Sequence, residues 1–209
     1  MTFVSAQYVE EDITIGSVTL PQYSIQVEVA YQDGDEDLGV KAEDLMTDLN
    51  RDKYIEDQNG DLILIGSREG LPAFNCVDYE VIRSVAFRNV MQGDTVLIDP
   101  GFITGNATFE FLYENQNGDF VPFDQRDHFD GIGCNPDFSI YFVDVNDPVP
   151  PGVPYSITQD GSKRGRITFD LIFAGFQYWL DIADFKIRIQ MYDRAGNASN
   201  VITTDAISK

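Results

Sequence analysis

Residues 23–31 read YSIQVEVAY, and this stretch is the strongest indicator of the fold class of the chain. Aromatic and aliphatic side chains alternate there with polar or small ones at period two, as in a strand that buries one face. The same alternation returns in residues 109–113, 167–173 and 185–191. Turn-forming clusters of glycine, asparagine, aspartate and proline separate these stretches. Many short strands joined by turns predict an all-β fold, which we expect to be an elaborated, immunoglobulin-like antiparallel β-sandwich with one or two short helices.

Weaker signals complete this outline. Short apolar runs in residues 62–65, 81–87 and 96–98 predict further strands, and helical patterns are confined to residues 41–50 and 176–184. Alternate residues of a strand face the same way, so the alternating stretches should share one core between two sheets. We predict that this core contains Phe109, Phe111, Ile167, Phe169, Ile187 and Ile189.

The length of 209 residues fits either one large β domain or two small ones. Hydrophobic residues make up 43% of the chain, which is enough for a packed core and argues against disorder. We predict that residues 1–20 are an N-terminal tether or edge segment and that residues 21–209 form a single sandwich. A sub-domain boundary near Cys76 is the alternative.

The charge of the chain limits its partners. Thirty-five acidic residues and 14 basic ones give a formal net charge of −21. A field of this sign repels nucleic acid and anionic membrane surfaces, so neither is an expected partner. Cations are the natural counter-ligands, although acidity that serves only solubility is the alternative. No apolar run reaches the ~20 residues of a membrane helix.

Cys76 and Cys134 are the two cysteines of the sequence. Neither belongs to a C-x-x-C pair, and with a single histidine in the chain they cannot form a zinc site of ordinary composition. Both occur in loop-like sequence, and two such cysteines pair in an exported protein. We predict a disulfide between Cys76 and Cys134, worth about 4 kcal/mol in the chain-entropy model. Two unpaired thiols are the alternative.

Residues 31–39 read YQDGDEDLG and form the most specific local signal. Asp33, Asp35 and Asp37 stand at alternate positions, and the glycines permit a tight loop, so that their carboxylates can converge on one Ca²⁺. Asp44 could complete the coordination. The spacing is not that of an EF-hand, and the alternative is a solvated turn whose aspartates accept hydrogen bonds from backbone N–H groups. Calcium is the one cofactor that we predict.

A second acidic loop, DVNDP in residues 144–148, resembles the inter-domain calcium motif of cadherins. The match covers these five residues without the companion motifs, so we predict no calcium site there.

The sequence offers no catalytic constellation, and we predict that the chain is not an enzyme. It contains no G-x-S-x-G, no phosphate-binding loop and no H-E-x-x-H motif. His128 lies in a charged stretch, where a surface residue is expected and not a general base. Phe176, Tyr178 and Trp179 are expected to plug one end of the sandwich, and a platform for stacking sugars is the alternative.

Several motifs follow one another in an order that resembles a family of surface lipoproteins of Bacteroidota, from about residue 20 to the end. They are DGDEDLG in residues 33–39, CVDY in 76–79, DTVL in 94–97, NGDF in 117–120, Cys134, RGRI in 164–167, KIRI in 186–189 and DRAGNASN in 193–200. The chain departs from the family at Glu36, where glycine is usual, and after Cys134, where Gly-Arg-x-Pro is usual.

The resemblance implies export, a lipid-anchored cysteine ahead of this sequence and an address at the bacterial outer membrane, on the cell surface or its periplasmic face. The activity of that family is not established. We predict a non-catalytic binding or structural component of an outer-membrane assembly, whose partner is an outer-membrane protein or a glycan. The alternatives are a protein that binds or degrades extracellular polysaccharide and a calcium-stiffened adhesin module.

Overall fold

The computed structural model describes residues 1–34, 36–41, 54–76, 78–82, 89–99, 105–129, 134, 138–160 and 163–209, without the side chain of Ile15. The chain forms two compact units. Unit 1 comprises Met1–Leu45, Thr104–Phe123 and Phe138–Lys209, and unit 2 comprises Met46–Ile103 and Asp124–Asp137.

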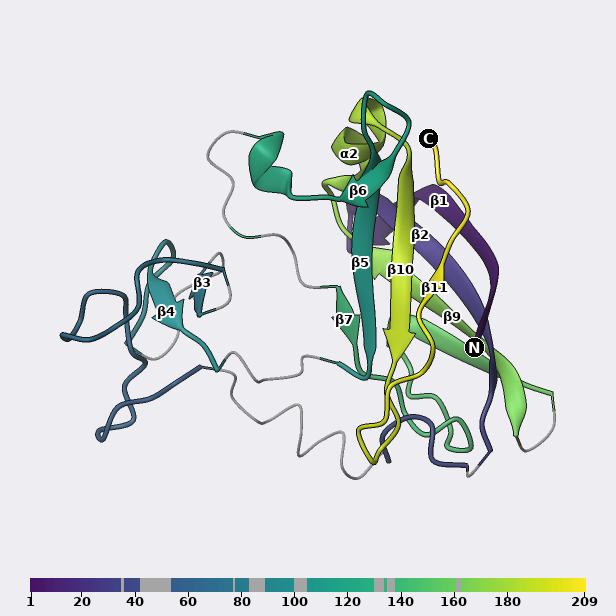
Figure 1. Cartoon of the computed structure of the whole chain (residues 1–209), viewed down its shortest axis with the longest axis horizontal. Helices are drawn as coiled ribbons and strands as arrows, with labels where there is room; N and C mark the ends of the chain where they lie inside the picture. Colours follow the sequence, from purple (N-terminus) through teal and green to yellow (C-terminus); the bar gives the residue numbers. More distant parts are fainter. Residues whose placement is uncertain are drawn as a thin grey trace. The chain divides into compact units, whose positions relative to one another are not determined.

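Unit 1 contains two antiparallel sheets (Figure 1). One has the order β1 (Thr2–Ile15), β2 (Val18–Gln32), β9 (Arg164–Ile172), β8 (Tyr155–Gln159). The other has the order β11 (Ile202–Thr203), β10 (Phe185–Met191), β5 (Ala107–Glu114), β6 (Phe120–Pro122), and β7 (Ser139–Ile140) also pairs with β5. The predicted all-β sandwich is confirmed.

The two sheets share a core built from alternate residues. In β9, residues 165, 167, 169 and 171 are buried, and in β10 every odd-numbered residue is buried. The rings of Phe109 on β5 and Phe169 on β9 meet edge to face, with centroids 5.1 Å apart. All six predicted core residues are buried, so the period-two interpretation of the sequence is confirmed.

One end of this core is filled by aromatic rings beneath α2 (Phe176–Ile182), the one α-helix among the described residues. Phe176 and Trp179 are buried, and both contact Phe111 with ring centroids 5.5 Å and 5.4 Å away. The predicted plug is therefore confirmed for these two residues, whereas Tyr178 is exposed. The second predicted helix, residues 41–50, lies outside the described residues apart from Lys41.

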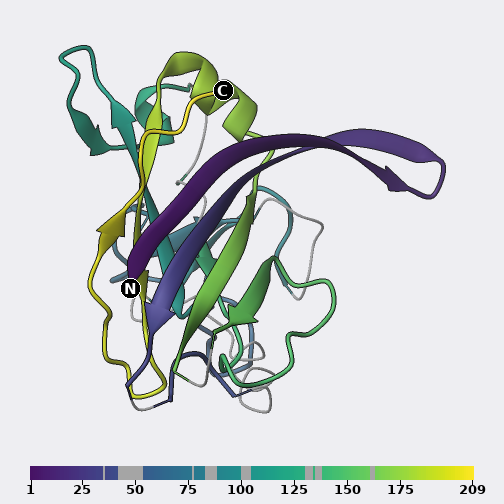
Figure 2. The same ribbon diagram turned by 90° about the vertical axis from the view of Figure 1, so that its right-hand side faces the viewer.

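Residues 1–20, expected as a tether or edge segment, form β1, which is the edge strand of its sheet, and the first residues of β2. The two strands pair along their whole length, from Thr2 opposite Ala30 to Ile15 opposite Val18. Gly16 turns the chain with a φ of 65°, a value that suits the first central residue of a type II′ hairpin turn. Figure 2 shows the resulting hairpin running out past β9 and β8.

Unit 2 has little regular structure among its described residues. β3 (Tyr79–Val81) and β4 (Thr95–Leu97) form a two-stranded sheet, and η1 (Gln125–Asp127) is a single 3-10 turn. β4 corresponds to the strand expected at 96–98, while residues 62–65 contribute single bridges and residues 83–88 lie outside the description. Two small buried clusters flank β3 and β4. One contains Leu62, Ile82, Val90 and Val96, and the other Ile63, Tyr79 and Leu97.

Candidate binding surfaces

The acidic loop that follows β2 is bound to the sandwich by its own backbone. The N–H of Val40 donates to the carbonyl of Phe142 at 3.0 Å, and Leu38 accepts from the N–H of Val145 at 3.1 Å. Gly39 lies between these bonds with a φ of 95°, and a Cβ at this position would stand 2.3 Å from the carbonyl oxygen of Val143. Only glycine fits here, so the loop is anchored at residues 38–40.

Asp33 lies at the start of this loop, and its carboxylate serves the loop backbone. One oxygen accepts the N–H of Leu38 at 2.9 Å, and the side chain is buried. The N–H of Asp33 donates to the carbonyl of Lys163 at 2.8 Å, which joins the loop to the turn between β8 and β9. Asp33 therefore holds the loop closed by accepting a backbone N–H five residues further along the chain.

Two basic side chains of unit 1 lie against the same loop. The ammonium group of Lys163 donates to the carbonyl of Gly34 at 2.8 Å and lies 3.6 Å from the carboxylate of Glu36. The guanidinium of Arg194 donates to the carbonyl of Glu36 at 3.1 Å and pairs with the buried carboxylate of Asp144, also at 3.1 Å. These cations offset part of the negative charge that a bound metal ion would otherwise neutralise.

Glu36 takes a backbone conformation that favours glycine. Its φ of 65° is the one positive value at a non-glycine position in the described part of the chain. The left-handed conformation at this point is strained for glutamate by about 1 kcal/mol, and the contacts of Lys163 and Arg194 hold it in place.

The structure describes two of the four predicted calcium ligands. Asp33 and Asp37 belong to the described loop, whereas Asp35 and Asp44 lie outside the described residues. Among the residues that are described, no group of three or more histidine, cysteine, aspartate or glutamate side chains is placed to hold a metal ion. Calcium binding by the full set of four remains a prediction.

The second acidic loop is a self-contained turn. Asp144 accepts from the backbone N–H and the side-chain amide of Asn146, at 2.9 Å and 3.0 Å, through one oxygen, while its other oxygen faces Arg194. Residues 145–149 with Ile157 and Gln159 line an open pocket of about 400 Å³. The amide of Gln159 already donates to the carbonyl of Val145 at 2.5 Å. The polar groups of this pocket are thus used within the fold.

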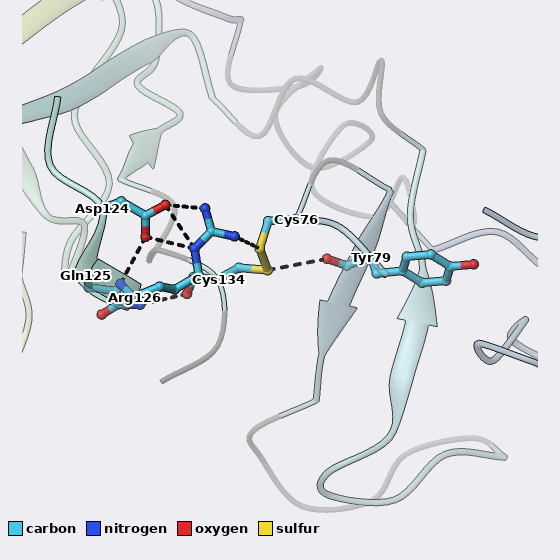
Figure 3. A network of polar contacts seen from close by, with 6 residues as sticks. All are labelled: Cys76, Tyr79, Asp124, Gln125, Arg126 and Cys134. Carbon is cyan, nitrogen blue, oxygen red and sulfur yellow. Dashed lines mark hydrogen bonds and ion pairs between the residues drawn. A yellow bond between two sulfur atoms is a disulfide. The ribbon is translucent and has the colours of Figure 1, made fainter. Parts of the chain in front are cut away.

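The predicted disulfide is present in unit 2. The sulfurs of Cys76 and Cys134 are 2.09 Å apart, and their Cα atoms are 5.4 Å apart. Figure 3 shows the polar network beside it, in which the guanidinium of Arg126 lies 3.2 Å from the sulfur of Cys76. Arg126 also pairs with Asp124, whose carboxylate caps the first turn of η1 by accepting the N–H of Arg126 at 2.9 Å.

The electrostatics of this network follow from that pairing. The hydrogen bond from Arg126 lowers the pKa of Asp124 below its usual value, and partial burial only reduces the shift. Gln125 is buried and donates to the carbonyl of Cys134 at 2.7 Å. His128 follows η1 and is exposed, as expected for a surface residue. Arg126 and Gln125 therefore contact the two cysteines directly, and Asp124 holds Arg126 in place.

The tip of the β1–β2 hairpin carries exposed apolar side chains that the alternating pattern of the sequence did not predict. Val18 and Leu20 are 53% and 50% exposed, although they lie in a paired strand. Leu20 is opposite Ile13, so both side chains point to the same face of the ribbon. The available signal was the pair Gly16-Ser17 between two alternating stretches, which is typical of a hairpin turn.

Comparison of the chain with protein-family models, with curated proteins and with solved structures finds no match. In the part of the chain that the structure describes, no helix combines the length and the apolar character needed to cross a membrane.

Proposed function

We propose that this chain is a non-catalytic domain of an exported bacterial lipoprotein, and that it binds or supports a partner at the outer membrane. The observation that carries this proposal is the hairpin of β1 and β2. It extends beyond its sheet and presents half-exposed Val18 and Leu20 on one face. Apolar side chains held out on a paired strand are typical of an interaction surface.

The disulfide supports the exported part of the proposal. Disulfides persist in the periplasm and at cell surfaces and are rare in the reducing cytosol. In unit 2 the bond between Cys76 and Cys134 joins two segments that are distant in sequence, where two small clusters are the only cores described. Small cores of this kind commonly need a covalent staple.

The non-catalytic part is supported by what the polar side chains do. Asp33 and Asp144 accept backbone hydrogen bonds in turns, and Arg126 and Asp124 pair with each other beside the disulfide. Charged groups fixed in this way hold the fold in place. Binding or degradation of polysaccharide and a calcium-stiffened adhesin module remain the alternatives.

The experiment is to follow the native protein in its bacterium. Cell fractionation with an antibody, combined with protease treatment of whole cells, should place it in the outer-membrane fraction. Alkylation of thiols before lysis should leave Cys76 and Cys134 unmodified. A cytoplasmic protein with two free thiols would refute the proposal. Purified protein that hydrolyses extracellular polysaccharide would favour the enzymatic alternative.

A further inference from the structure

The outer part of the β1–β2 hairpin, residues 10–22, extends beyond β9 as a two-stranded ribbon, which we call the hairpin arm. β9 pairs with β2 only from Ser24 to Gln32, whereas β1 and β2 remain paired as far as Ile15 and Val18. Figure 2 shows the arm extending past the ends of β9 and β8. A two-stranded ribbon by itself is marginally stable in water, so an arm of this length is suited to gaining a further strand.

The amphipathic pattern of β2 inverts where the arm begins. Within the sandwich its odd-numbered residues are buried, Ile25, Val27 and Val29 among them. In the arm the apolar side chains move to even positions, at Val18 and Leu20, with Ile13 beside them on β1. Successive side chains of a strand point to opposite faces, so the apolar face of the arm continues the outer face of the sheet. The sandwich core cannot cover it.

The edge of β1 is open along the arm. β1 is the first strand of its sheet and pairs with β2 on one side. Proteins protect such edges with charged side chains, lysine above all, and with proline or a bulge. Along residues 9–15 of β1 there is neither lysine nor proline, and the one irregularity in the β1–β2 register lies between Phe3 and Ser5. The charges of this stretch are acidic, so they repel an acidic strand and leave the edge open to a basic one.

Charge decides which kind of strand can occupy this edge. Glu10, Glu11 and Asp12 are consecutive and exposed, and residues 1–40 contain no lysine, arginine or histidine. A second copy of the chain would bring like charges side by side, which destabilises strand pairing. Glu10 and Asp12 lie on the face opposite to Ile13, because side chains alternate along β1.

We propose that the hairpin arm captures an extended segment of a partner protein in which apolar residues alternate with lysine or arginine. The segment adds to the edge of β1 through backbone hydrogen bonds, as in β-augmentation. Its apolar side chains continue the face of Ile13 and Leu20, and its basic side chains lie beside Glu10 and Asp12. This inference rests on the proposed binding role and names its site and the chemistry of the partner.

The test uses the whole protein and two short synthetic peptides, one alternating lysine with valine and one alternating glutamate with valine. Hydrogen exchange should show protection of amides in residues 9–15 with the lysine peptide and none with the glutamate peptide. Added salt should weaken binding, because the paired charges are exposed. The variant Glu10→Gln with Asp12→Asn should bind the lysine peptide about tenfold more weakly.

Matched apolar substitutions separate the arm from the rest of the sheet. Ile13→Ser should also reduce binding about tenfold or more, because Ile13 is the apolar side chain of β1 that lies beside the added strand. Ile172→Ser is the control, since Ile172 on β9 is 53% exposed in the same sheet but outside the arm, and it should leave binding unchanged.

Three results would overturn the inference while leaving the proposed function intact. They are equal protection by both peptides or none by either, concentration-dependent dimers that protect the arm without peptide, and insertion of the arm into phosphatidylcholine vesicles. The last two would identify a second copy or a lipid surface as the occupant. The proposed function fails separately, if the native protein proves to be cytoplasmic with reduced cysteines.

Discussion

Unit 1 buries long alternate faces of two sheets, whereas unit 2 buries two small clusters on either side of β3 and β4. In unit 1 the core contains large side chains such as Phe142, Phe169 and Phe185, all nearly inaccessible to water. In unit 2 the described clusters contain four and three buried residues, and the disulfide joins Cys76 to a segment 58 residues away. Among the described residues, the disulfide is thus found where apolar burial is smallest.

The largest effect that we expect is the loss of an aromatic ring from unit 1. Phe169 is fully buried and contacts Phe109 and Phe142. Phe169→Ala should lower the free energy of unfolding of unit 1 by about 3–5 kcal/mol, because a cavity is left in a core that cannot collapse onto it. Hydrogen exchange should become faster in β9 and β10 and stay unchanged near residues 54–65. Equal acceleration in both units would show that they unfold together.

Removing the disulfide should have the complementary effect. Cys76→Ser with Cys134→Ser should destabilise unit 2 by about 2–4 kcal/mol, because the unfolded segment regains the freedom of a long loop. The measurement is urea denaturation with exchange read separately in each unit. The wild-type protein under reducing conditions provides the matched control. Unchanged exchange around β3 and β4 would show that their two clusters are sufficient without the staple.

The two units also differ in how far their sequences predict them. In unit 1, Phe169 and Ile187 belong to uninterrupted period-two stretches, so their burial could be predicted. In unit 2, Leu62 and Ile63 are neighbours that are both buried, in clusters on opposite sides, so no alternation marks them. When both faces of a sheet are covered, successive residues are buried and the sequence does not alternate between apolar and polar residues.

The candidate sites show the same limit. The disulfide could be predicted because a chain with two cysteines allows one pairing. The contact of Lys163 with Gly34 joins residues 129 positions apart, and that of Arg194 with Glu36 joins residues 158 positions apart. These partners follow from sheet order and register, which the alternating pattern does not specify. The exposed arm was not predicted because the apolar residues of β2 are at odd positions in the sandwich and at even positions in the arm.

Calcium is expected to stabilise unit 1 and to leave unit 2 unchanged. Asp33, Asp35, Asp37 and Asp44 are predicted to hold one ion, and a ligand that binds only the folded state stabilises it by about 2.7 kcal/mol at a hundred times its dissociation constant. The melting temperature of unit 1 should rise with millimolar Ca²⁺, fall with chelator and lose this response in Asp35→Ala. If neither calcium nor chelator changes the melting temperature, Lys163 and Arg194 alone compensate the negative charge of the loop.

The smallest expected effect concerns the polar network beside the disulfide of unit 2. The hydrogen bond from Arg126 holds the pKa of Asp124 below its ordinary value near 3.9. The ionised carboxylate is therefore favoured in the folded state, and its contribution is fully present above about pH 4 and is lost as the pH falls through the lowered pKa. Because Arg126 is half exposed, the contribution should not exceed about 1 kcal/mol.

Asp124→Asn should consequently be less stable than the wild-type protein at pH 7, and the difference should shrink as the pH approaches 2. Urea denaturation of both proteins across this range measures it, with exchange around η1 as the local readout. Asp127→Asn is the control for charge, because it removes the same charge three residues away and leaves the hydrogen bonds between Arg126 and Asp124 in place. The absence of a difference at every pH would assign the role of Asp124 to its cap of η1, since an asparagine oxygen accepts that hydrogen bond without a charge.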